Sequence, residues 1–169
     1  RLSMPAKIAL FVDVQNIYYT VRQAYQAQFD YTAFWQEISQ KGEIVSAYAY
    51  AIDRGDPKQR RFQNFLKQLG FEIKLKPYIQ RSDGSAKGDW DVGIALDAYE
   101  AASEVDTVVL ASGDGDFDLL ALKVQERFNT RFEVYGVPSL TATSIINAAS
   151  QFNPINEPLL MKRQGYVKS

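Results

Sequence analysis

Three short segments of the sequence carry carboxylates in patterns that could do chemistry. Asp13 follows an apolar run, Asp91 lies in KGDWDV at 87–92, and Asp114 and Asp116 lie in SGDGDF at 112–117. Carboxylates held together either raise one another's pKa or bind a cation that neutralises them. Oxygen ligands favour Mg²⁺ or Mn²⁺ over Zn²⁺. Such an ion activates water and stabilises charge on a phosphoryl group, so a phosphodiester is the expected substrate class.

The composition narrows the chemistry further, because the 169 residues include no histidine and no cysteine. Disulfides, a thiolate nucleophile and cysteine-based zinc or iron–sulfur sites are therefore excluded. The usual general base near neutral pH is also missing. Metal-assisted chemistry on carboxylates fits this inventory best. The net charge of -1 gives no general attraction to nucleic acid, so binding a polyanion would require a local basic patch.

The elements that must position these acids alternate between strands and helices, which predicts an α/β fold with a mostly parallel sheet. Apolar runs at 8–12 and 107–111 are typical of strands buried on both faces. Further strands are expected at 43–52, at 71–77 on an edge, and at 131–137 as the last one. Helices are expected at 16–28, 30–38, 58–69, 89–104, 114–128 and from Ser139 or Thr141 to Ala149.

This order of elements places the acids at one edge of the sheet. Ligands of open α/β sheets bind beyond the carboxyl ends of the strands, where Asp13 and the Asp114/Asp116 pair lie. Helix capping is the alternative explanation for a single acid after a strand. Capping does not explain two acids in 114–116, and the glycines at 113 and 115 indicate a tight backbone there. Asp97, six residues after Asp91, points away from it on a helix and is expected either to support the metal ligands indirectly or to be structural.

Taken in order and spacing, these motifs resemble a known family. Asp13-x-x-Asn16, the Lys-Gly-x-x-Asp-Val segment at 87–92 and the Ser-Gly-Asp-x-Asp-Phe segment at 112–117 are similar to the NYN domain of the PIN-like nuclease superfamily, which includes the LabA-like bacterial proteins. The resemblance extends from Ile8 to about Phe152. It implies a PIN-like three-layer α/β/α sandwich with a central, mostly parallel sheet. It also implies a single domain over 4–160 and a C-terminal tail over 161–169.

The resemblance also assigns roles to residues. The set that it implies to be catalytic and metal-binding is Asp13, Asp91, Asp114 and Asp116. Accompanying polar positions, assigned to substrate binding, are Asn16, Ser112 and Lys87. The common pattern has one residue between Gly and Asp in the Lys-Gly segment, and here Asp89 and Trp90 intervene. Both Asp89 and Asp91 therefore stay open for this role, and the Val92 and Asp97 that follow favour Asp91.

Two groups of basic residues could hold a phosphate backbone beside the acids. They comprise Arg54, Lys58, Arg60 and Arg61 in one group and Lys74, Lys76, Arg81 and Lys87 in the other. Arg54 and Lys58 are the expected substrate contacts, with a solvated charged face as the alternative. Tyr18, Tyr19 and Trp90 are candidates for stacking on unpaired bases, and a core or groove-wall role is the alternative for the tyrosines. The Gly- and Ser-containing turn at 81–86 could form a lid.

The resulting hypothesis is a Mg²⁺- or Mn²⁺-dependent ribonuclease that acts on single-stranded RNA. The alternative is a catalytically silent RNA- or protein-binding regulator with the same fold. A haloacid-dehalogenase-like site would need a second Asp at position 15, where this chain has Gln15, and a Toprim-like site would need Glu after the first strand. RNA is the expected partner and a homodimer is possible. The first apolar run is too short to span a membrane, so the expected location is cytoplasmic.

Overall fold

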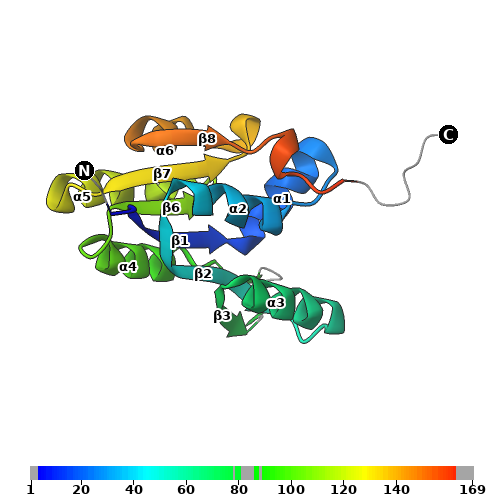
Figure 1. The fold of residues 1–169 in the computed structure, drawn as a ribbon. Helices are drawn as coiled ribbons and strands as arrows, with labels where there is room; N and C mark the ends of the chain where they lie inside the picture. The colour runs from blue at the N-terminus through cyan, green and yellow to red at the C-terminus, as the bar shows by residue number, and fades with distance from the viewer. Residues whose placement is uncertain (1–3, 78, 81–85, 88, 163–169) are drawn as a thin grey trace.

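The central feature of the fold is a sheet of six strands in the order β3-β2-β1-β6-β7-β8, in which every pairing is parallel (Figure 1). This computed structural model describes residues 4–77, 79–80, 86–87 and 89–162, with only the backbone at 79–80 and 86–87. The strands are β1 (Lys7–Asp13), β2 (Glu43–Asp53), β3 (Glu72–Pro77), β6 (Thr107–Ala111), β7 (Arg131–Gly136) and β8 (Gln151–Pro154). A separate antiparallel pair joins β4 (Ile79–Gln80) to β5 (Ala86–Lys87).

Helices cover both faces of the sheet, giving the three layers that were predicted. One core contains Leu10 and Val12 with side chains from α1 (Val14–Tyr25), α2 (Tyr31–Lys41) and α3 (Pro57–Leu69). The other contains Ala9 and Phe11 with side chains from α4 (Asp91–Ala102), α5 (Asp118–Phe128) and α6 (Thr143–Ala148). Successive β1 residues thus point to opposite faces, and both faces are apolar because both are covered. The predicted PIN-like α/β/α sandwich is confirmed.

The strand order explains why polar residues gather at one edge. The chain runs from β1 outward to β2 and β3, and then returns through α4 to β6 on the other side of β1. The direction of winding therefore reverses between β1 and β6, whose last paired residues are Val12 and Ala111. A crevice opens at such a switch point beyond the carboxyl ends of the two strands. Asp13 and the segment that begins with Ser112 lie there.

Local signals account for most helix limits. Asp13, Asp30 and Asp56 each accept a backbone hydrogen bond at the start of α1, α2 and α3. The predicted helix over 16–28 is wrong at its end, because α1 stops at Tyr25 and Gln26 adopts a left-handed conformation (φ 49°). No local signal marks this position, since Gln has no preference for that conformation.

Two further expectations are corrected. The strand over 131–137 is not the last, because β8 follows it and pairs with β7 at the sheet edge. Strand β8 has only four residues and ends in Pro154. Short strands with a proline occur at sheet edges, where no backbone N–H is needed to pair with a further strand. The helix predicted from 114 begins as a 3₁₀ turn, η1 (Gly115–Phe117), and becomes α-helical only at Asp118.

The C-terminal part of the described chain returns to α1 and α2. A 3₁₀ turn, η3 (Glu157–Leu159), is followed by a bridge from Leu160 to Phe29 and a hydrogen bond from the Met161 N–H to the Gln28 carbonyl. The domain limits 4–160 and 161–169 stay predictions, and residues 163–169 lie outside the described residues. Within the described ranges, each helix is too short or too polar to cross a bilayer.

Candidate metal centre

Three carboxylates meet at the carboxyl edge of the sheet. Asp91 lies in the first turn of α4, Asp114 follows β6, and Asp116 lies in η1. One carboxylate oxygen of each lies within 4.8 Å of the others. The Asp116 N–H donates to Asp114 Oδ1 at 2.9 Å, which fixes the turn between these two residues. The order β1-β6 and the start of α4 thus bring together acids that are distant in the sequence.

Asp13 lies beside this group and is connected to it through Ser112. The Ser112 hydroxyl donates to Asp13 Oδ2 at 3.2 Å and accepts from the Asp114 N–H at 3.2 Å. The other oxygen of Asp13 accepts from the Asn16 N–H at 3.4 Å. Ser112 is fully buried, so its hydroxyl acts within the protein and links the ends of β1 and β6. The structure therefore brings all four predicted acids to one place, three of them in a single close group.

Asn16 makes a second link between the two strand ends. Its side-chain Oδ1 accepts from the Gly113 N–H at 2.9 Å. A Cβ atom at Gly113 would lie 2.8 Å from the Leu140 carbonyl oxygen, so no larger residue fits without a shift. A Cβ at Gly115 would lie 2.8 Å from Ala142 Cβ. The predicted tight backbone at 113–115 therefore results from close packing against residues 140–142. No sequence motif near 113–115 indicates this contact.

Asp89 and Asp97 make hydrogen bonds that hold the helix carrying Asp91 in place. Asp89 Oδ1 accepts from the Asp91 N–H at 3.2 Å, so Asp89 supports the start of α4 and lies outside the close group. Asp97 Oδ2 accepts from the Tyr50 hydroxyl and from Lys74 Nζ, both at 2.8 Å. It therefore ties α4 to β2 and β3, which agrees with the structural one of the two roles predicted for it.

The pKa values of two of these acids, Asp13 and Asp91, are raised above the ordinary value of an aspartate. Burial raises the pKa of Asp13 to about 6, the charges of Asp114 and Asp89 add to this, and hydrogen bonds from Asn16 and Ser112 oppose it. Burial, followed by the hydrogen bond and charge of Asp114, raises the pKa of Asp91 to about 7. Among ion pairs between described residues, none involves these acids. Within the part of the chain that the structure describes, the negative charge of this group is therefore not offset by an ion pair.

This arrangement fits a divalent cation. The donors are carboxylate oxygens only, which are ligands that Mg²⁺ and Mn²⁺ favour. The raised pKa values show that the ionised forms are disfavoured in the protein alone, and a bound cation would reverse this. The residues that could hold it are Asp91, Asp114 and Asp116, with Asp13 adjacent.

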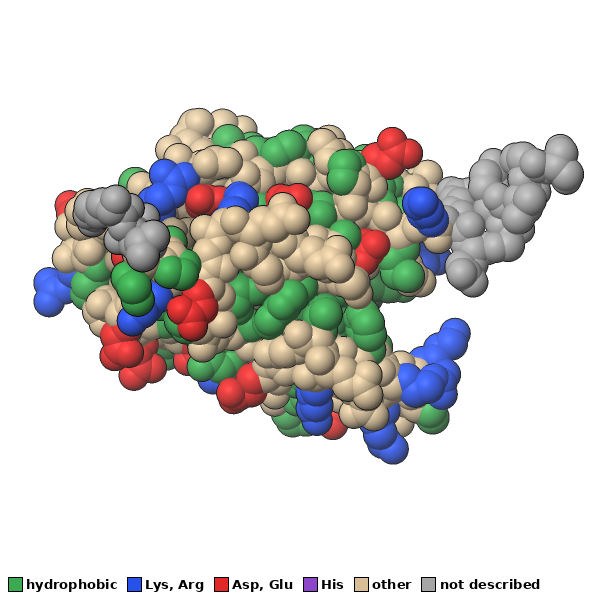
Figure 2. Space-filling model, viewed as in Figure 1, with side chains coloured by type: hydrophobic (Ala, Val, Ile, Leu, Met, Phe, Trp, Pro, Cys, Tyr) green, Lys and Arg blue, Asp and Glu red, His purple; other side chains and the backbone are tan. Residues whose placement is uncertain are grey.

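The predicted phosphate contacts lie on the neighbouring strand–helix junction. Arg54 is in the exposed loop after β2, where its backbone N–H donates to Gln59 Oε1 at 2.8 Å, and Lys58 is in the first turn of α3. Figure 2 shows Lys and Arg side chains gathered at the lower right, over α3. Two acids flank Arg54, with Asp53 at the end of β2 and Asp56 directly before α3. Arg81, the Lys87 side chain and the loop proposed as a lid lie outside the described residues.

The three candidate stacking residues differ in exposure. Tyr18 and Tyr19 are 48% and 53% exposed, and their rings meet edge to face at 5.2 Å. Trp90 is packed more tightly, because its indole N–H donates to the Ala51 carbonyl at 2.9 Å and Lys76 Nζ lies 4.6 Å from its ring centroid. The tyrosine pair on α1 is therefore the better exposed aromatic surface near the site.

With this geometry established, comparison with known proteins identifies the family. Residues 7–156 match the NYN domain. The chain belongs to the NYN domain family. It is 27% identical over 161 residues to the low amplitude and bright protein LabA of Synechococcus elongatus, covering 90% of this chain and 86% of that protein. The family predicted from the three acidic motifs is confirmed.

A solved structure shows the same fold in a relative. The crystal structure of a protein of unknown function from Vibrio parahaemolyticus superimposes with a TM-score of 0.90 and 55% sequence identity. The match covers 95% of this chain and 99% of that chain. At this identity the two proteins share one architecture throughout.

Proposed function

We propose that this NYN domain is a divalent-metal-dependent ribonuclease that hydrolyses phosphodiester bonds in single-stranded RNA. The observation that carries the proposal is the close group Asp91, Asp114 and Asp116, in which Asp91 has a pKa of about 7. Structural carboxylates are usually compensated by cations or hydrogen-bond donors, whereas strongly perturbed ones concentrate at functional sites. The match to the NYN family supports a nuclease-like site.

Each acid has a distinct task in this proposal. Asp91, Asp114 and Asp116 hold Mg²⁺ or Mn²⁺, which when bound stabilises charge on the phosphoryl group and activates water. Asp13 completes the acidic set, and its carboxylate accepts the proton that the attacking water gives up. A pKa of about 6 keeps Asp13 ionised at neutral pH while leaving it basic enough to accept a proton. Ser112 and Asn16 hold Asp13 and the 113–116 segment in a fixed relation.

The substrate lies across the switch point between the basic and aromatic residues. Arg54 and Lys58 contact backbone phosphates and thereby position the chain without reading its sequence. Tyr18 and Tyr19 offer exposed ring faces on which unpaired bases stack. Asn16 Oδ1 is engaged by Gly113, so the amide group Nδ2 is the part of this side chain that can donate to a phosphate.

A catalytically silent regulator is the second candidate function. The observation in its favour is the name of the cyanobacterial relative, which describes low amplitude and brightness and no reaction. In this case the same acids bind a metal ion and the domain binds RNA or a protein, but it does not cleave RNA.

A cleavage assay separates the two. Purified protein is incubated with end-labelled single-stranded RNA, with and without Mn²⁺, beside Asp114→Asn and the control Glu100→Gln, which alters an exposed carboxylate on α4. The nuclease proposal expects cleavage that requires both Mn²⁺ and Asp114 and that Glu100→Gln retains. Metal binding by calorimetry without cleavage of varied RNAs would instead support the regulator.

A further inference from the structure

Helix α3 carries positive charge that no acid on the helix balances. Its 13 residues include no acid and four basic residues with exposed side chains, which are Lys58, Arg60, Arg61 and Lys67. Among the ion pairs between described residues, none involves these four. Asp53 and Asp56 precede the helix, and residues 53–69 still contain three more basic than acidic side chains. In a chain whose net charge is -1, α3 is therefore a local site of attraction for anions.

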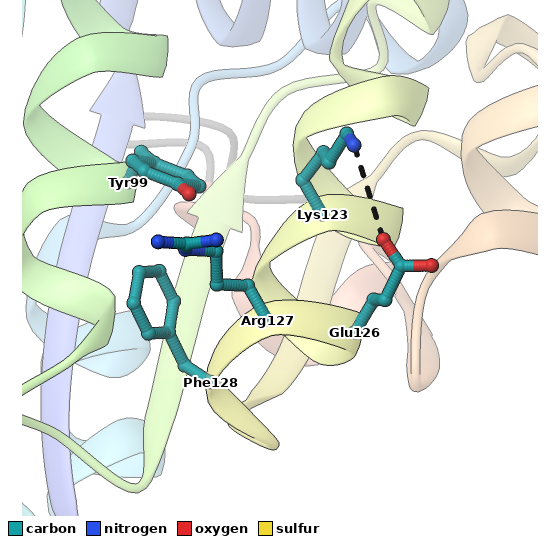
Figure 3. Close-up of a pocket in the computed structure, with 5 residues that line it drawn as sticks. All are labelled: Tyr99, Lys123, Glu126, Arg127 and Phe128. Atoms are coloured by element: carbon teal, nitrogen blue, oxygen red, sulfur yellow. Dashed lines mark ion pairs between the residues drawn. The ribbon is translucent and has the colours of Figure 1, made fainter.

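The basic residues of α5, on the other face of the sheet, lie among acids. Figure 3 shows Lys123 beside Glu126, and the Lys123 Nζ and Glu126 Oε1 atoms are 3.9 Å apart. The same view shows the Arg127 side chain extending from α5 toward Tyr99 on α4. Helix α4 contains three acidic residues and no basic one. The surface formed by α4 and α5 is therefore mixed in charge and lacks the positive excess of α3.

An exposed aromatic ring lies among the basic side chains of α3. Phe65 is 43% exposed, whereas Phe62 on the same helix packs against Tyr31 with ring centroids 5.5 Å apart. Phe65 follows Arg61 by four residues and Lys58 by seven, and these spacings place the three side chains in one stripe along the helix. Phe62 thus contributes to the core, while Phe65 presents its ring to solvent beside two cations.

This stripe begins at the edge of the sheet that carries the acidic centre. Helix α3 starts at Pro57, shortly after the end of β2, and β2 pairs in parallel with β1 so that Tyr50 lies opposite Asp13. Figure 1 shows α3 running back along β2 and β3 from this edge. Lys58 lies in the first turn, and Phe65 is about 10 Å further along the helix axis. A strand held at the acidic centre can therefore continue along α3, away from the carboxylates.

We propose that the stripe of Lys58, Arg61 and Phe65 binds single-stranded RNA beyond the bond that is cleaved, with Phe65 stacking on an unpaired base and the two cations contacting flanking phosphates. Surfaces that bind single strands combine these contacts, because cations follow the backbone and aromatic rings stack on bases of any sequence. An acidic protein segment would satisfy the cations but would give the ring no base to stack on. The inference rests on the proposed function in that the acidic centre and α3 act on the same strand.

Binding in EDTA tests the stacking contact under conditions in which a metal-dependent nuclease does not cleave. Fluorescence anisotropy measures the affinity of labelled oligouridine for the wild type, Phe65→Ala and Phe65→Trp. We expect Phe65→Ala to weaken binding at least about fivefold, the lower range for the loss of one stacked base, and Phe65→Trp to retain the affinity. Inorganic polyphosphate has charges but no bases, so calorimetry should show that it binds equally well to Phe65→Ala. No binding of oligouridine by the wild type, or an unchanged affinity in Phe65→Ala, would overturn the proposal.

The charged part of the stripe is tested by Arg61→Gln. This variant should bind both oligouridine and polyphosphate more weakly, and for oligouridine the slope of log K against log salt should fall by about 0.7, the value for one phosphate contact. Lys67→Gln is the matched control, because Lys67 lies about 160° from Phe65 around the helix and should leave the slope unchanged. Circular dichroism verifies that the variants are folded. Equal losses in Arg61→Gln and Lys67→Gln would exclude a defined stripe.

Cleavage kinetics distinguish a failure of this inference from a failure of the proposed nuclease. Where the wild type cleaves RNA with Mn²⁺, Phe65→Ala and Arg61→Gln should raise KM and leave kcat near the wild-type value, because both residues lie away from the acidic centre. Cleavage with an unchanged KM in both variants would contradict the inference and leave the nuclease proposal standing. Binding in EDTA that depends on Phe65 and Arg61, without cleavage in Mn²⁺, would support the inference and contradict the nuclease proposal.

Discussion

Two groups of carboxylates in this molecule have pKa values that are shifted in opposite directions. Glu133 on β7 is only 7% exposed, yet it accepts from Lys41 at 3.0 Å, Arg131 at 3.1 Å and Asn153 at 3.1 Å. Burial alone would raise the pKa of Glu133, but these three partners outweigh it and hold the pKa below its ordinary value. At the acidic centre, the pKa values of Asp13 and Asp91 are raised, to about 6 and about 7.

This difference in pKa distinguishes a carboxylate with a structural role, Glu133, from the carboxylates of the candidate metal centre. Glu133 is a compensated carboxylate that connects β7 to α2 and to β8, so its ionised form stabilises the fold. The acidic centre is uncompensated by the described protein groups, so its ionised form costs stability until a cation binds. The comparison predicts opposite effects on folding and on activity when the acids of the two groups are neutralised.

The largest expected effect is on catalysis at the centre. Asp13→Asn should lower the Mn²⁺-dependent cleavage rate about 10³-fold, roughly 4 kcal/mol, because it removes both a charge and a proton acceptor. Initial rates on labelled RNA measure this loss. Glu133→Gln is the matched control and should cleave at the normal rate below its melting temperature. A similar rate loss in both variants would remove the distinction between the two groups.

The next effect concerns the stability that Glu133 provides. Glu133→Gln should lower the free energy of unfolding at pH 7 by about 2 kcal/mol, less than for a fully buried pair because Lys41 and Arg131 are partly exposed. Since the folded pKa lies below the ordinary value, the contribution is complete above that value and disappears as pH falls through the folded pKa. Urea unfolding at pH 7 and pH 3 should show the difference only at pH 7. A deficit that persists undiminished at pH 3 would contradict the account.

Asp91→Asn should act in the opposite direction. Asp91 is partly exposed, so solvent screening reduces the penalty that its raised pKa implies to about 1 kcal/mol. The penalty grows as pH rises from the unfolded pKa toward about 7 and stays constant above it. In EDTA at pH 8 the variant should therefore be more stable than the wild type, and at pH 3.5 equally stable. A less stable variant at pH 8 would show that Asp91 is a structural acid like Glu133.

The smallest expected effect lies at the basic junction. Lys58→Ala should weaken binding of single-stranded RNA about threefold and lower the slope of log K against log salt by about 0.7, the value for one phosphate contact. Lys67→Ala, in the last turn of the same helix, is the matched control. Fluorescence anisotropy at several salt concentrations measures both. Equal effects of Lys58→Ala and Lys67→Ala would indicate a diffuse charge effect without a defined phosphate contact.

Much of the fold and of the site could be predicted because their signals are local. The runs at 8–12 and 107–111 are apolar throughout, and strands covered on both faces require this. Asp13 and Asp114 follow those strands directly, so the rule for open sheets places them at one crevice. The three acidic motifs also carried enough spacing information to indicate the family.

Other features depend on contacts between distant residues. The edge strand β8 has four residues, and its pairing with β7 rather than its own composition makes it a strand. The close packing of residues 140–142 against Gly113 and Gly115 follows from the tertiary fold. Glu133 and its neighbour Arg131 are the charged residues of β7 and were a local signal of a compensated charge. The other two partners of Glu133, Lys41 and Asn153, lie 92 and 20 residues away.

The most direct test of the central claim is a calorimetric titration of the protein with Mn²⁺ at pH 7 and pH 5. The account predicts binding at pH 7 with release of protons, at least tenfold weaker binding at pH 5, where Asp13 and Asp91 are protonated, and a comparable loss in Asp91→Asn at pH 7. Glu133→Gln should bind like the wild type. Absence of Mn²⁺ binding by the wild type, or unchanged affinity in Asp91→Asn, would contradict the assignment of a metal centre.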